Sequence, residues 1–261
     1  MAELDLDYTG EMPQTDQRVY SDALADYEIW RQSRAGKVNA STCEKICGTT
    51  PTSAKLPFSS VQRLYDPNNA FFKYVTGMAL EKQYGTYFRN EDIKAFKYGR
   101  YMEPLIKEHL DKKGVLSNEC GNIEIIKDVF NCTPDGKLFD GRALEIKAAM
   151  SADSYFDRTQ SNYDKSHTDF WQTQSEMLAC NCDTMIYCTA LPVADTQSVI
   201  VRGYGLATDL LGVHVRELKA DKDAQEYLLA RAKLAGALRD YWLENQHLSM
   251  IECFEEIKKL C

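Results

Sequence analysis

The spacing of apolar residues in this chain changes between residues 112 and 123, and this change limits the fold more than any other feature. Segments 68–84 and 92–112 carry apolar residues at a spacing of about 3.6, which is typical of an α-helix. Beyond Gly114 the period falls to about two, which predicts strands. The predicted strands are residues 123–125, 129–132 and 144–148, joined as a β-meander by turns at 127–128 and 134–136.

The rest of the chain adds further helices and strands to this arrangement. Ser41 is a candidate N-cap for a helix over 40–47, and the polar residues 151–167 are predicted to form a loop. Further predicted elements are a helix at 168–180, strands at 184–190 and 198–204, and a helical region from about 221 to 261. This order predicts one α/β domain, residues 27–261, with a central mixed β-sheet flanked by helices.

Charge is unevenly distributed along the sequence. The chain of 261 residues has 31 Lys and Arg against 39 Asp and Glu, a net charge of −8. Residues 1–28 hold eight of these acids and one base, whereas residues 29–110 hold thirteen bases and seven acids. Residues 1–26 are therefore expected to be an acidic, flexible tail, and the following segment can present a basic face to nucleic acid. Whether the tail competes with DNA or only solubilises the protein is open at this stage.

Several classes of protein are excluded by the composition. No segment approaches the roughly 18 apolar residues that cross a bilayer, and the acidic N-terminus does not resemble a signal peptide. We therefore expect no membrane partner and a cytoplasmic location. The nine cysteines have no repeating spacing, which favours reduced thiols without an iron–sulfur cluster, and the histidines lack the spacing of a zinc site.

The most informative stretch is Pro134-Asp135-Gly136 followed by Leu144-Glu145-Ile146-Lys147. Side chains two apart on a strand share a face, so Glu145 and Lys147 point one way while Leu144 and Ile146 point into a core. If the turn brings Asp135 alongside, two carboxylates and one ammonium converge. That set suits Mg²⁺-assisted phosphodiester hydrolysis, although each piece alone is also common in ordinary turns and strands.

At this point the sequence resembles a known family. The turn and strand look like the core of the PD-(D/E)xK nuclease superfamily, specifically the phage lambda exonuclease type, also called the YqaJ-like viral recombinases. Three further segments agree with it in order and approximate spacing: an opening motif from Trp30 through Arg34 to Ser41, the Gly99-x-x-x-Glu103 helix, and Gln172-x-Gln174. The resemblance spans about residues 28–205.

The resemblance implies a role for each matching residue. Asp135, Glu145 and the backbone carbonyl of Ile146 would bind metal, and Lys147 would position the attacking water. Glu103 would be an additional acidic ligand, with Pro104 placing it either at the start of a helix or at a bend. Gln172 and, as a further candidate, Gln174 would lie near the metals and the scissile strand. Arg34 and Ser41 would hold a terminal 5′ phosphate.

The function implied by the resemblance is an exonuclease that starts at the ends of double-stranded DNA. It would degrade one strand 5′ to 3′ and leave single-stranded DNA for recombination. The reaction would use two Mg²⁺ ions, for which Mn²⁺ could substitute. Expected partners are a single-strand annealing or binding protein and two further copies of the chain in a homotrimer. The alternatives are a structure-specific or restriction-like endonuclease of the same fold, or a non-catalytic module that binds DNA or another partner.

Overall fold

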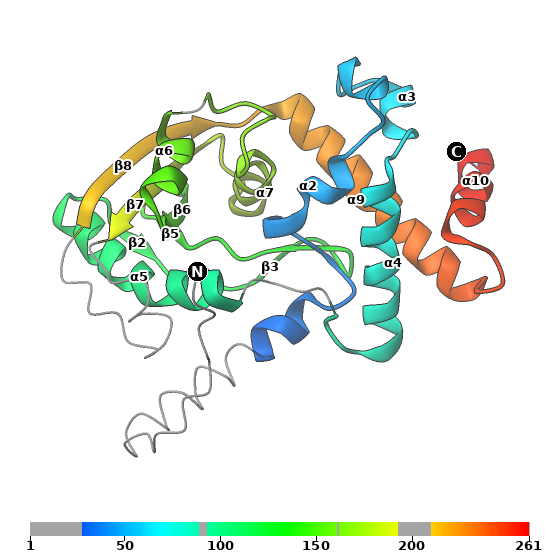
Figure 1. The fold of residues 1–261 in the computed structure, drawn as a ribbon, viewed down its shortest axis with the longest axis horizontal. Helices are drawn as coiled ribbons and strands as arrows, with labels where there is room; N and C mark the ends of the chain where they lie inside the picture. The colour runs from blue at the N-terminus through cyan, green and yellow to red at the C-terminus, as the bar shows by residue number, and fades with distance from the viewer. Residues whose placement is uncertain (1–27, 89–92, 161, 193–209, 261) are drawn as a thin grey trace, which may run out of the picture.

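The computed structural model describes residues 28–88, 93–160, 162–192 and 210–260 (Figure 1). These residues form two mixed β-sheets flanked by helices, which confirms the predicted fold class. The larger sheet has the order β2-β5-β6-β7-β8, in which β6 and β7 are parallel and the other pairs are antiparallel. Its strands are β2 (Ser117–Asn118), β5 (Gly136–Leu138), β6 (Ala143–Ala148), β7 (Thr184–Pro192) and β8 (Leu210–Lys219).

Strand β6 lies in the middle of the larger sheet, between β5 and β7, with a helix packed against each face. On one face, Leu144 and Ile146 pack against α5 (Ile93–Lys112). On the other face, Ala143 packs with Met177 of α7 (Phe170–Cys180). Because side chains alternate along a strand, this packing directs Glu145 and Lys147 toward α7.

The smaller sheet has the order β1-β4-β3 and corrects the predicted meander. Its strands are β1 (Val38–Asn39), β3 (Ile123–Ile126) and β4 (Phe130–Cys132). Strand β4 pairs with β3 and β1, whereas β6 belongs to the larger sheet, so the segment around Asp135 carries the chain from one sheet to the other. The sequence analysis missed β5, which pairs with β6 through Gly136 and Leu144, because three residues are too few to show a period.

Two other predictions of local structure are wrong. The stretch 151–167 is not a continuous loop, because it contains α6 (Ala152–Gln160). This helix packs against β7, and Arg216 of β8 donates a hydrogen bond to the carbonyl of Thr159, so tertiary contacts hold a segment with little apolar pattern. Residues 40–47 form two short helices, η1 (Ala40–Thr42) and α2 (Glu44–Cys47), and Ser41 lies inside η1 instead of capping it. The predicted tail 1–26 and strand 198–204 lie outside the described residues.

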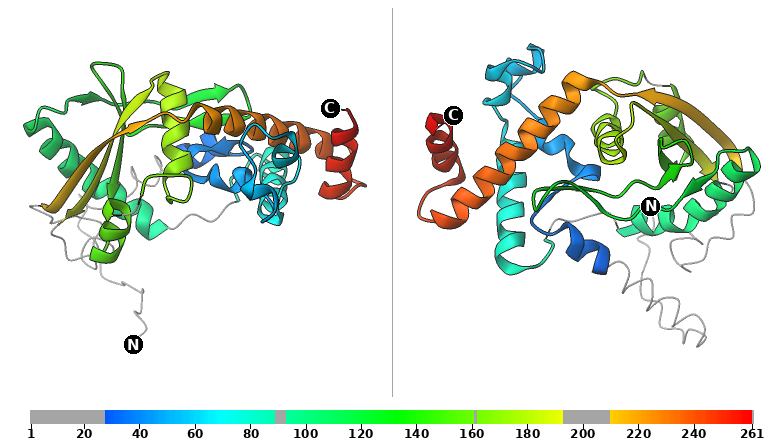
Figure 2. Two further views of the ribbon diagram at one scale, coloured as in Figure 1. Left: turned by 90° about the horizontal axis from the view of Figure 1, so that it is seen from above. Right: turned by 180° about the vertical axis from the view of Figure 1, so that it is seen from behind.

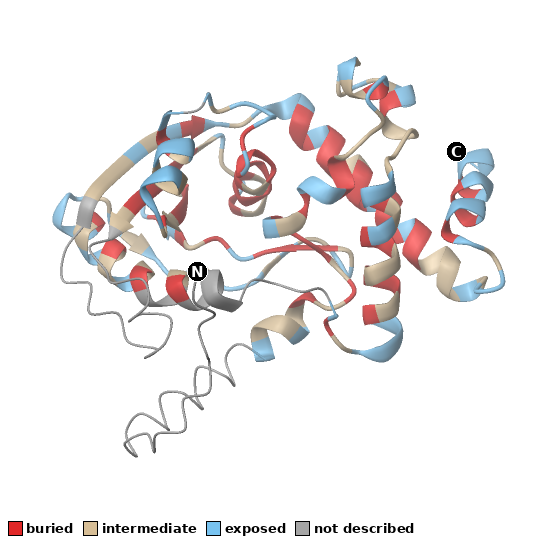
Figure 3. Cartoon of the chain, in the orientation of Figure 1, coloured by how far each residue is buried: buried red, intermediate tan, exposed pale blue. Residues whose placement is uncertain are grey.

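The remaining helices form a second layer beside the larger sheet (Figures 1 and 2). Figure 2 shows the long helix α9 leaving the end of β8 and running along this layer to α10. Buried residues, red in Figure 3, follow the inner sides of α7 and α9. No helix within the described ranges is both long and apolar enough to cross a membrane. The elements of this layer are η2 (Ser53–Lys55), α3 (Val61–Leu64), α4 (Asn69–Tyr84), α9 (Lys222–Glu244) and α10 (Met250–Leu260).

Arg231 joins α9 to the loops around α2 and α3. Its fully buried guanidinium donates hydrogen bonds to the backbone carbonyls of Ile46 at 2.6 Å, Leu64 at 2.7 Å and Gly48 at 2.9 Å. It also lies over the ring of Phe71, with 4.2 Å between the guanidinium carbon and the ring centroid. The fork of donors therefore binds three backbone carbonyls at once, one of which, that of Gly48, also accepts from the N–H of Asn68.

We predict that Arg231→Met lowers the free energy of unfolding by roughly 3–5 kcal/mol, because the carbonyls of Ile46 and Leu64 lose this donor and that of Gly48 keeps only the N–H of Asn68 at 3.4 Å. The matched control is Arg142→Met, since Arg142 pairs near the surface with Asp140 and Glu217 and its loss is expected to cost less than about 1 kcal/mol. Urea unfolding followed by circular dichroism measures both. Equal losses in the two variants would contradict the role given to Arg231.

Candidate active site

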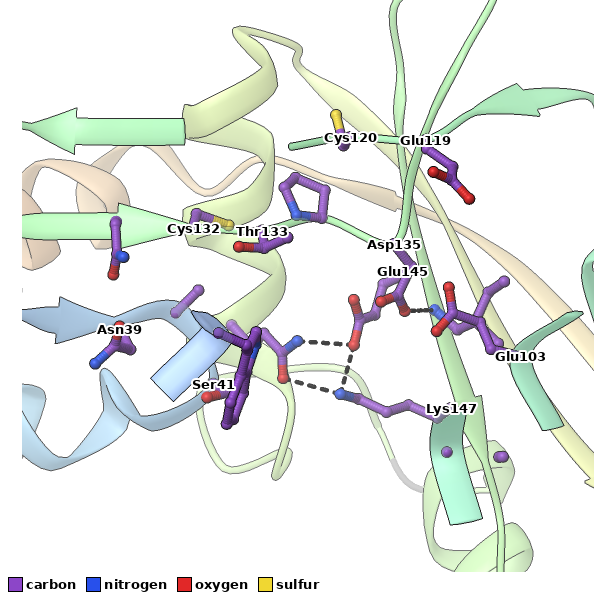
Figure 4. A pocket seen from close by; sticks show the side chains of 18 of the residues that line it. Asn39, Ser41, Glu103, Glu119, Cys120, Cys132, Thr133, Asp135, Glu145 and Lys147 are labelled. Atoms are coloured by element: carbon purple, nitrogen blue, oxygen red, sulfur yellow. Dashed lines mark hydrogen bonds and ion pairs between the residues drawn. The ribbon is translucent and has the colours of Figure 1, made fainter. Parts of the chain in front are cut away.

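A cleft of about 580 Å³ lies between the two sheets, α5 and α7. Figure 4 shows its side chains, which come from the segment before η1, from the turn between β4 and β5, and from β6, α5 and α7. All of the predicted site residues except Gln174 line this cleft: Arg34, Ser41, Glu103, Asp135, Glu145, Ile146, Lys147 and Gln172.

Asp135 is fixed to the strand that carries the other acidic residue of the motif. One oxygen of its carboxylate, Oδ2, accepts a hydrogen bond from the backbone N–H of Ile146 at 2.7 Å. The pairing of Gly136 with Leu144 brings the turn alongside β6, so this contact follows from the sheet register. Figure 4 shows Asp135, Glu145 and Glu103 converging on the same part of the cleft.

Glu145, Lys147 and Gln172 form a closed triangle of polar contacts. The amide nitrogen of Gln172 donates to Oε1 of Glu145 at 2.7 Å, and the ammonium of Lys147 donates to the amide oxygen of Gln172 at 2.9 Å. Lys147 and Glu145 also form an ion pair. Each polar head is thus held by the other two, which restricts the rotamers of all three side chains.

The two carboxylates of the motif are strongly perturbed. Burial, and then the negative charge of Glu145, raises the pKa of Asp135 well above its ordinary value. Burial, and then the charge of Glu176, likewise raises the pKa of Glu145. For Lys147, burial alone would lower the pKa, but the charges of Glu145, Asp169 and Asp135 raise it overall. The site therefore holds excess negative charge in a poorly solvated place.

A divalent cation fits this donor set. Oε2 of Glu145 is buried, and no N–H or hydroxyl of the residues that the structure describes donates to it, so it can accept a cation beside Asp135. No three His, Cys, Asp or Glu side chains in the part of the chain that the structure describes are grouped so as to hold a metal on their own. Mg²⁺, however, is usually bound by one or two carboxylates and keeps several waters, so Asp135 and Glu145 with a backbone carbonyl meet its requirements.

Glu103 and Gln174 have different surroundings. Pro104 lies inside a continuous α5, so Glu103 is part of the helix and does not begin it. Glu103 lines the cleft and forms an ion pair with Lys107 at 2.6 Å. Gln174 is not brought to the cleft. Its buried amide donates to the carbonyl of Lys219 at 3.4 Å and accepts from the N–H of Asp221 at 2.9 Å, so it ties α7 to the start of α9.

Arg34 and Ser41 meet although they are seven positions apart in the sequence. A terminal nitrogen of Arg34 donates a hydrogen bond to the hydroxyl of Ser41, and the guanidinium stacks over Trp30 at 4.1 Å from the ring centroid. Gly36 allows the chain to turn between them: its φ is 71°, and a Cβ there would lie 2.9 Å from that of Lys82. The turn places a guanidinium and a hydroxyl on one wall of the cleft.

The sequence analysis missed two residues around this site. Glu176 is fully buried on α7 and accepts a hydrogen bond from the amide of Gln172 at 2.8 Å. The spacing of four between them was an available signal, because such residues share a helix face. Arg158 of α6 also lines the cleft, but it lies in the stretch predicted as a loop.

Glu176 makes stability depend on pH. Burial raises its pKa to about 8, above the value near 4.3 expected in the unfolded chain, so the folded state binds the extra proton. Its contribution to stability is complete below about pH 4 and is lost as the pH rises through about 8. A glutamine at this position would resemble the protonated acid at every pH.

We therefore predict that Glu176→Gln changes the Tm little at pH 5 but raises it at pH 8.5, by an amount on the order of 3–8 °C. Differential scanning calorimetry in the presence of a chelator measures the Tm at both pH values. The control is Glu226→Gln, because Glu226 is exposed on α9. A shift that is the same at both pH values would show that Glu176 is not protonated on folding.

Comparisons with known proteins point to one kind of fold. No protein-family model and no curated protein match the chain. Among solved structures, an alkaline exonuclease (LHK-Exo) from Laribacter hongkongensis matches with a TM-score of 0.57 and 17% identity, over 90% of this chain and all of that one. LHK-Exo in complex with dAMP matches with a TM-score of 0.57, 18% identity and the same coverage.

A third match comes from another bacterium. A phage-related exonuclease from Haemophilus somnus 129PT has a TM-score of 0.61 and 16% identity, over 80% of this chain and 96% of that one. At these identities the likeness concerns the arrangement of the backbone. The chain therefore has the fold of these exonucleases, and the predicted structural resemblance to the lambda exonuclease type is confirmed.

Proposed function

We propose that this protein is a Mg²⁺-dependent exonuclease that begins at the ends of double-stranded DNA and degrades one strand 5′ to 3′. The observation that carries the proposal is the cleft itself, where buried Glu145 lies beside Lys147 and half-buried Asp135, and where no N–H or hydroxyl of the described residues donates to Oε2 of Glu145. The matched structures support it, because they are structures of exonucleases and one of them contains a deoxyribonucleotide, dAMP.

In this proposal Asp135, Glu145 and the backbone carbonyl of Ile146 hold the metal, and Glu103 adds a ligand directly or through water. When bound, Mg²⁺ would acidify a water molecule and screen the charge of the phosphate; two ions would divide these tasks, and Mn²⁺ could replace them. The high pKa of Lys147 keeps it as an ammonium at neutral pH. Lys147 is therefore a donor that orients the attacking water and stabilises hydroxide, and it does not act as a base.

Gln172 supports this arrangement by contacting both Glu145 and Lys147. Its amide oxygen keeps the ammonium in place, and its amide nitrogen binds Oε1 of Glu145, so Gln172 does not occupy Oε2. Such fixed geometry matters because misplacement of catalytic groups by about 1 Å can slow a reaction about 100-fold.

The proposed polarity rests on Arg34 and Ser41. A guanidinium fork and a hydroxyl match the oxygens of a terminal 5′ phosphate, so the strand would enter the cleft by its 5′ end. The product would be single-stranded DNA suited to recombination. A homotrimer around the duplex and a single-strand annealing or binding protein as partner stay predictions of the resemblance.

The first test uses linear duplexes labelled at either end, with Mg²⁺ or with a chelator. We expect nucleotides to be released from the 5′ end only with metal, and Asp135→Asn or Lys147→Ala to slow this release by about 1,000-fold or more. The matched control is Asp140→Asn, because Asp140 is exposed, pairs with Arg142 and does not line the cleft. Full activity in Asp135→Asn would reject the site, and cutting of closed circular DNA would favour the endonuclease.

The second test compares duplexes with a 5′ phosphate and with a 5′ hydroxyl. Arg34→Ala is expected to reduce the rate on phosphorylated ends by about 10–100-fold more than on hydroxyl ends, the range for one hydrogen bond to a charged group. Arg31→Ala is the control, since Arg31 lies on the same helical segment but contacts Glu28 and the carbonyl of Tyr87. Equal losses on both substrates would make Arg34 a general contact to the DNA backbone.

A further inference from the structure

Arg158 brings a guanidinium into the cleft from α6, an element that carries none of the residues in the family motifs. Its Nε donates to Oδ2 of Asp169 at 3.1 Å, and its Nη1 donates to the hydroxyl of Ser154 at 2.6 Å. The side chain keeps 25% of its surface exposed, so the guanidinium is anchored on one side and open on the other.

The anchor is rigid because Asp169 is almost fully buried. The same oxygen that binds Arg158 also accepts a hydrogen bond from the hydroxyl of Tyr187 at 2.7 Å. Burial would raise the pKa of Asp169, but Lys147, Arg158 and the Tyr187 hydroxyl lower it overall, so it stays ionised. Asp169 does not line the cleft, which makes it a support for the guanidinium and not a metal ligand.

The donors of Arg158 are only partly used. An arginine has five N–H groups, and two are engaged by Asp169 and Ser154; no other described residue accepts from this guanidinium. The other cationic side chains of the cleft have partners that are themselves part of it: Lys107 pairs with Glu103, Lys147 with Glu145, and Arg34 with Ser41. Among these four cations, only Arg158 has its described acceptors, Asp169 and Ser154, outside the cleft lining, so its remaining N–H groups can bind an anion that enters.

The position of Arg158 separates it from the residues proposed for the terminal phosphate. Ser41 lies in η1, which packs against α7 and β4, whereas Arg158 lies on α6, which packs against β7. Glu145 and Lys147 on β6 line the same cleft. A DNA strand held at its end by Arg34 and Ser41 would therefore meet Arg158 at a different phosphate.

We propose that Arg158 binds a non-bridging oxygen of an internal phosphate of the DNA strand in the cleft, distinct from the phosphate held by Arg34 and Ser41. The inference rests on the proposed function for the identity of the strand. A guanidinium suits this role because its planar fork matches phosphate oxygens and its charge does not titrate.

The test measures DNA affinity against salt concentration, in the Asp135→Asn background with Mg²⁺ so that the strand is not cut. Each phosphate contact contributes about 0.9 to the slope of log affinity against log salt concentration, so we expect Arg158→Gln to reduce the slope by about that amount. Arg142→Gln is the matched control and should leave the slope unchanged, because Arg142 pairs with Asp140 and Glu217 away from the cleft. An unchanged slope in Arg158→Gln would overturn the inference.

A second variant covers the case in which Arg158→Gln fails to fold because it leaves Asp169 with an unpaired charge. The double variant Arg158→Gln with Asp169→Asn removes both charges of the pair. The same loss of slope is expected from it, whereas a retained slope would again overturn the inference.

The phosphate itself can be located with duplexes in which single linkages are methylphosphonates. We expect one internal linkage at which a methylphosphonate weakens DNA binding by the Asp135→Asn protein about tenfold, which corresponds to the loss of one charge-assisted hydrogen bond. At the same linkage, binding by the protein that also carries Arg158→Gln should weaken less than twofold. If only the terminal phosphate showed this coupling, the internal site would be rejected. If the wild-type protein releases nucleotides but no internal linkage depends on Arg158, the role of Arg158 is rejected and the proposed exonuclease stands. If binding depends on Arg158 but no nucleotides are released, the proposed exonuclease is rejected and the phosphate site stands.

Discussion

The contact between Glu145, Lys147 and Gln172 is the interaction on which the rest of this structure depends. It places an ion pair on a central strand where the surroundings are otherwise apolar. A buried charge is costly unless a partner and hydrogen bonds compensate it, and here each of the three groups supplies compensation to the other two. The carboxylate of Asp135 adds negative charge that this triangle does not neutralise, whereas Glu176, which contacts Gln172, keeps its proton in the folded state at neutral pH. This uncompensated negative charge favours the binding of a cation in the cleft.

The framework around this triangle explains how it is kept in place. Strand β6 is parallel to β7 and antiparallel to β5, so its backbone is paired on both sides. Apolar side chains of α5 cover one face, and α7 covers the other and carries Gln172 and Glu176. The helical layer is joined to this core through α9, where Arg231 satisfies carbonyls from loops near α2 and α3. Rigid elements thus support the site from both faces of the sheet.

The guanidinium and hydroxyl groups that can bind phosphate reach the cleft from elements that are far apart in the chain. Arg34 and Ser41 precede the first long helix, whereas Arg158 lies on the crossover between β6 and β7. The two arginines are held differently: Arg34 by stacking on Trp30, and Arg158 by a buried carboxylate that Tyr187 also binds. The carboxylates at the centre of the cleft and the fixed guanidinium groups at its walls support the proposal that it binds a phosphodiester strand together with metal ions.

The sequence by itself determined the α/β class, the two long helices before residue 113, and the pattern of Asp135, Glu145 and Lys147, because local periodicity and a short motif carry that information. Only the tertiary structure decided which strands pair. It separated β4 from β6, inserted β5, formed α6 in a polar stretch, and turned Gln174 away toward α9. It also brought Glu176 and Arg158 to the site. These outcomes depend on contacts between residues distant in sequence, which no local pattern records.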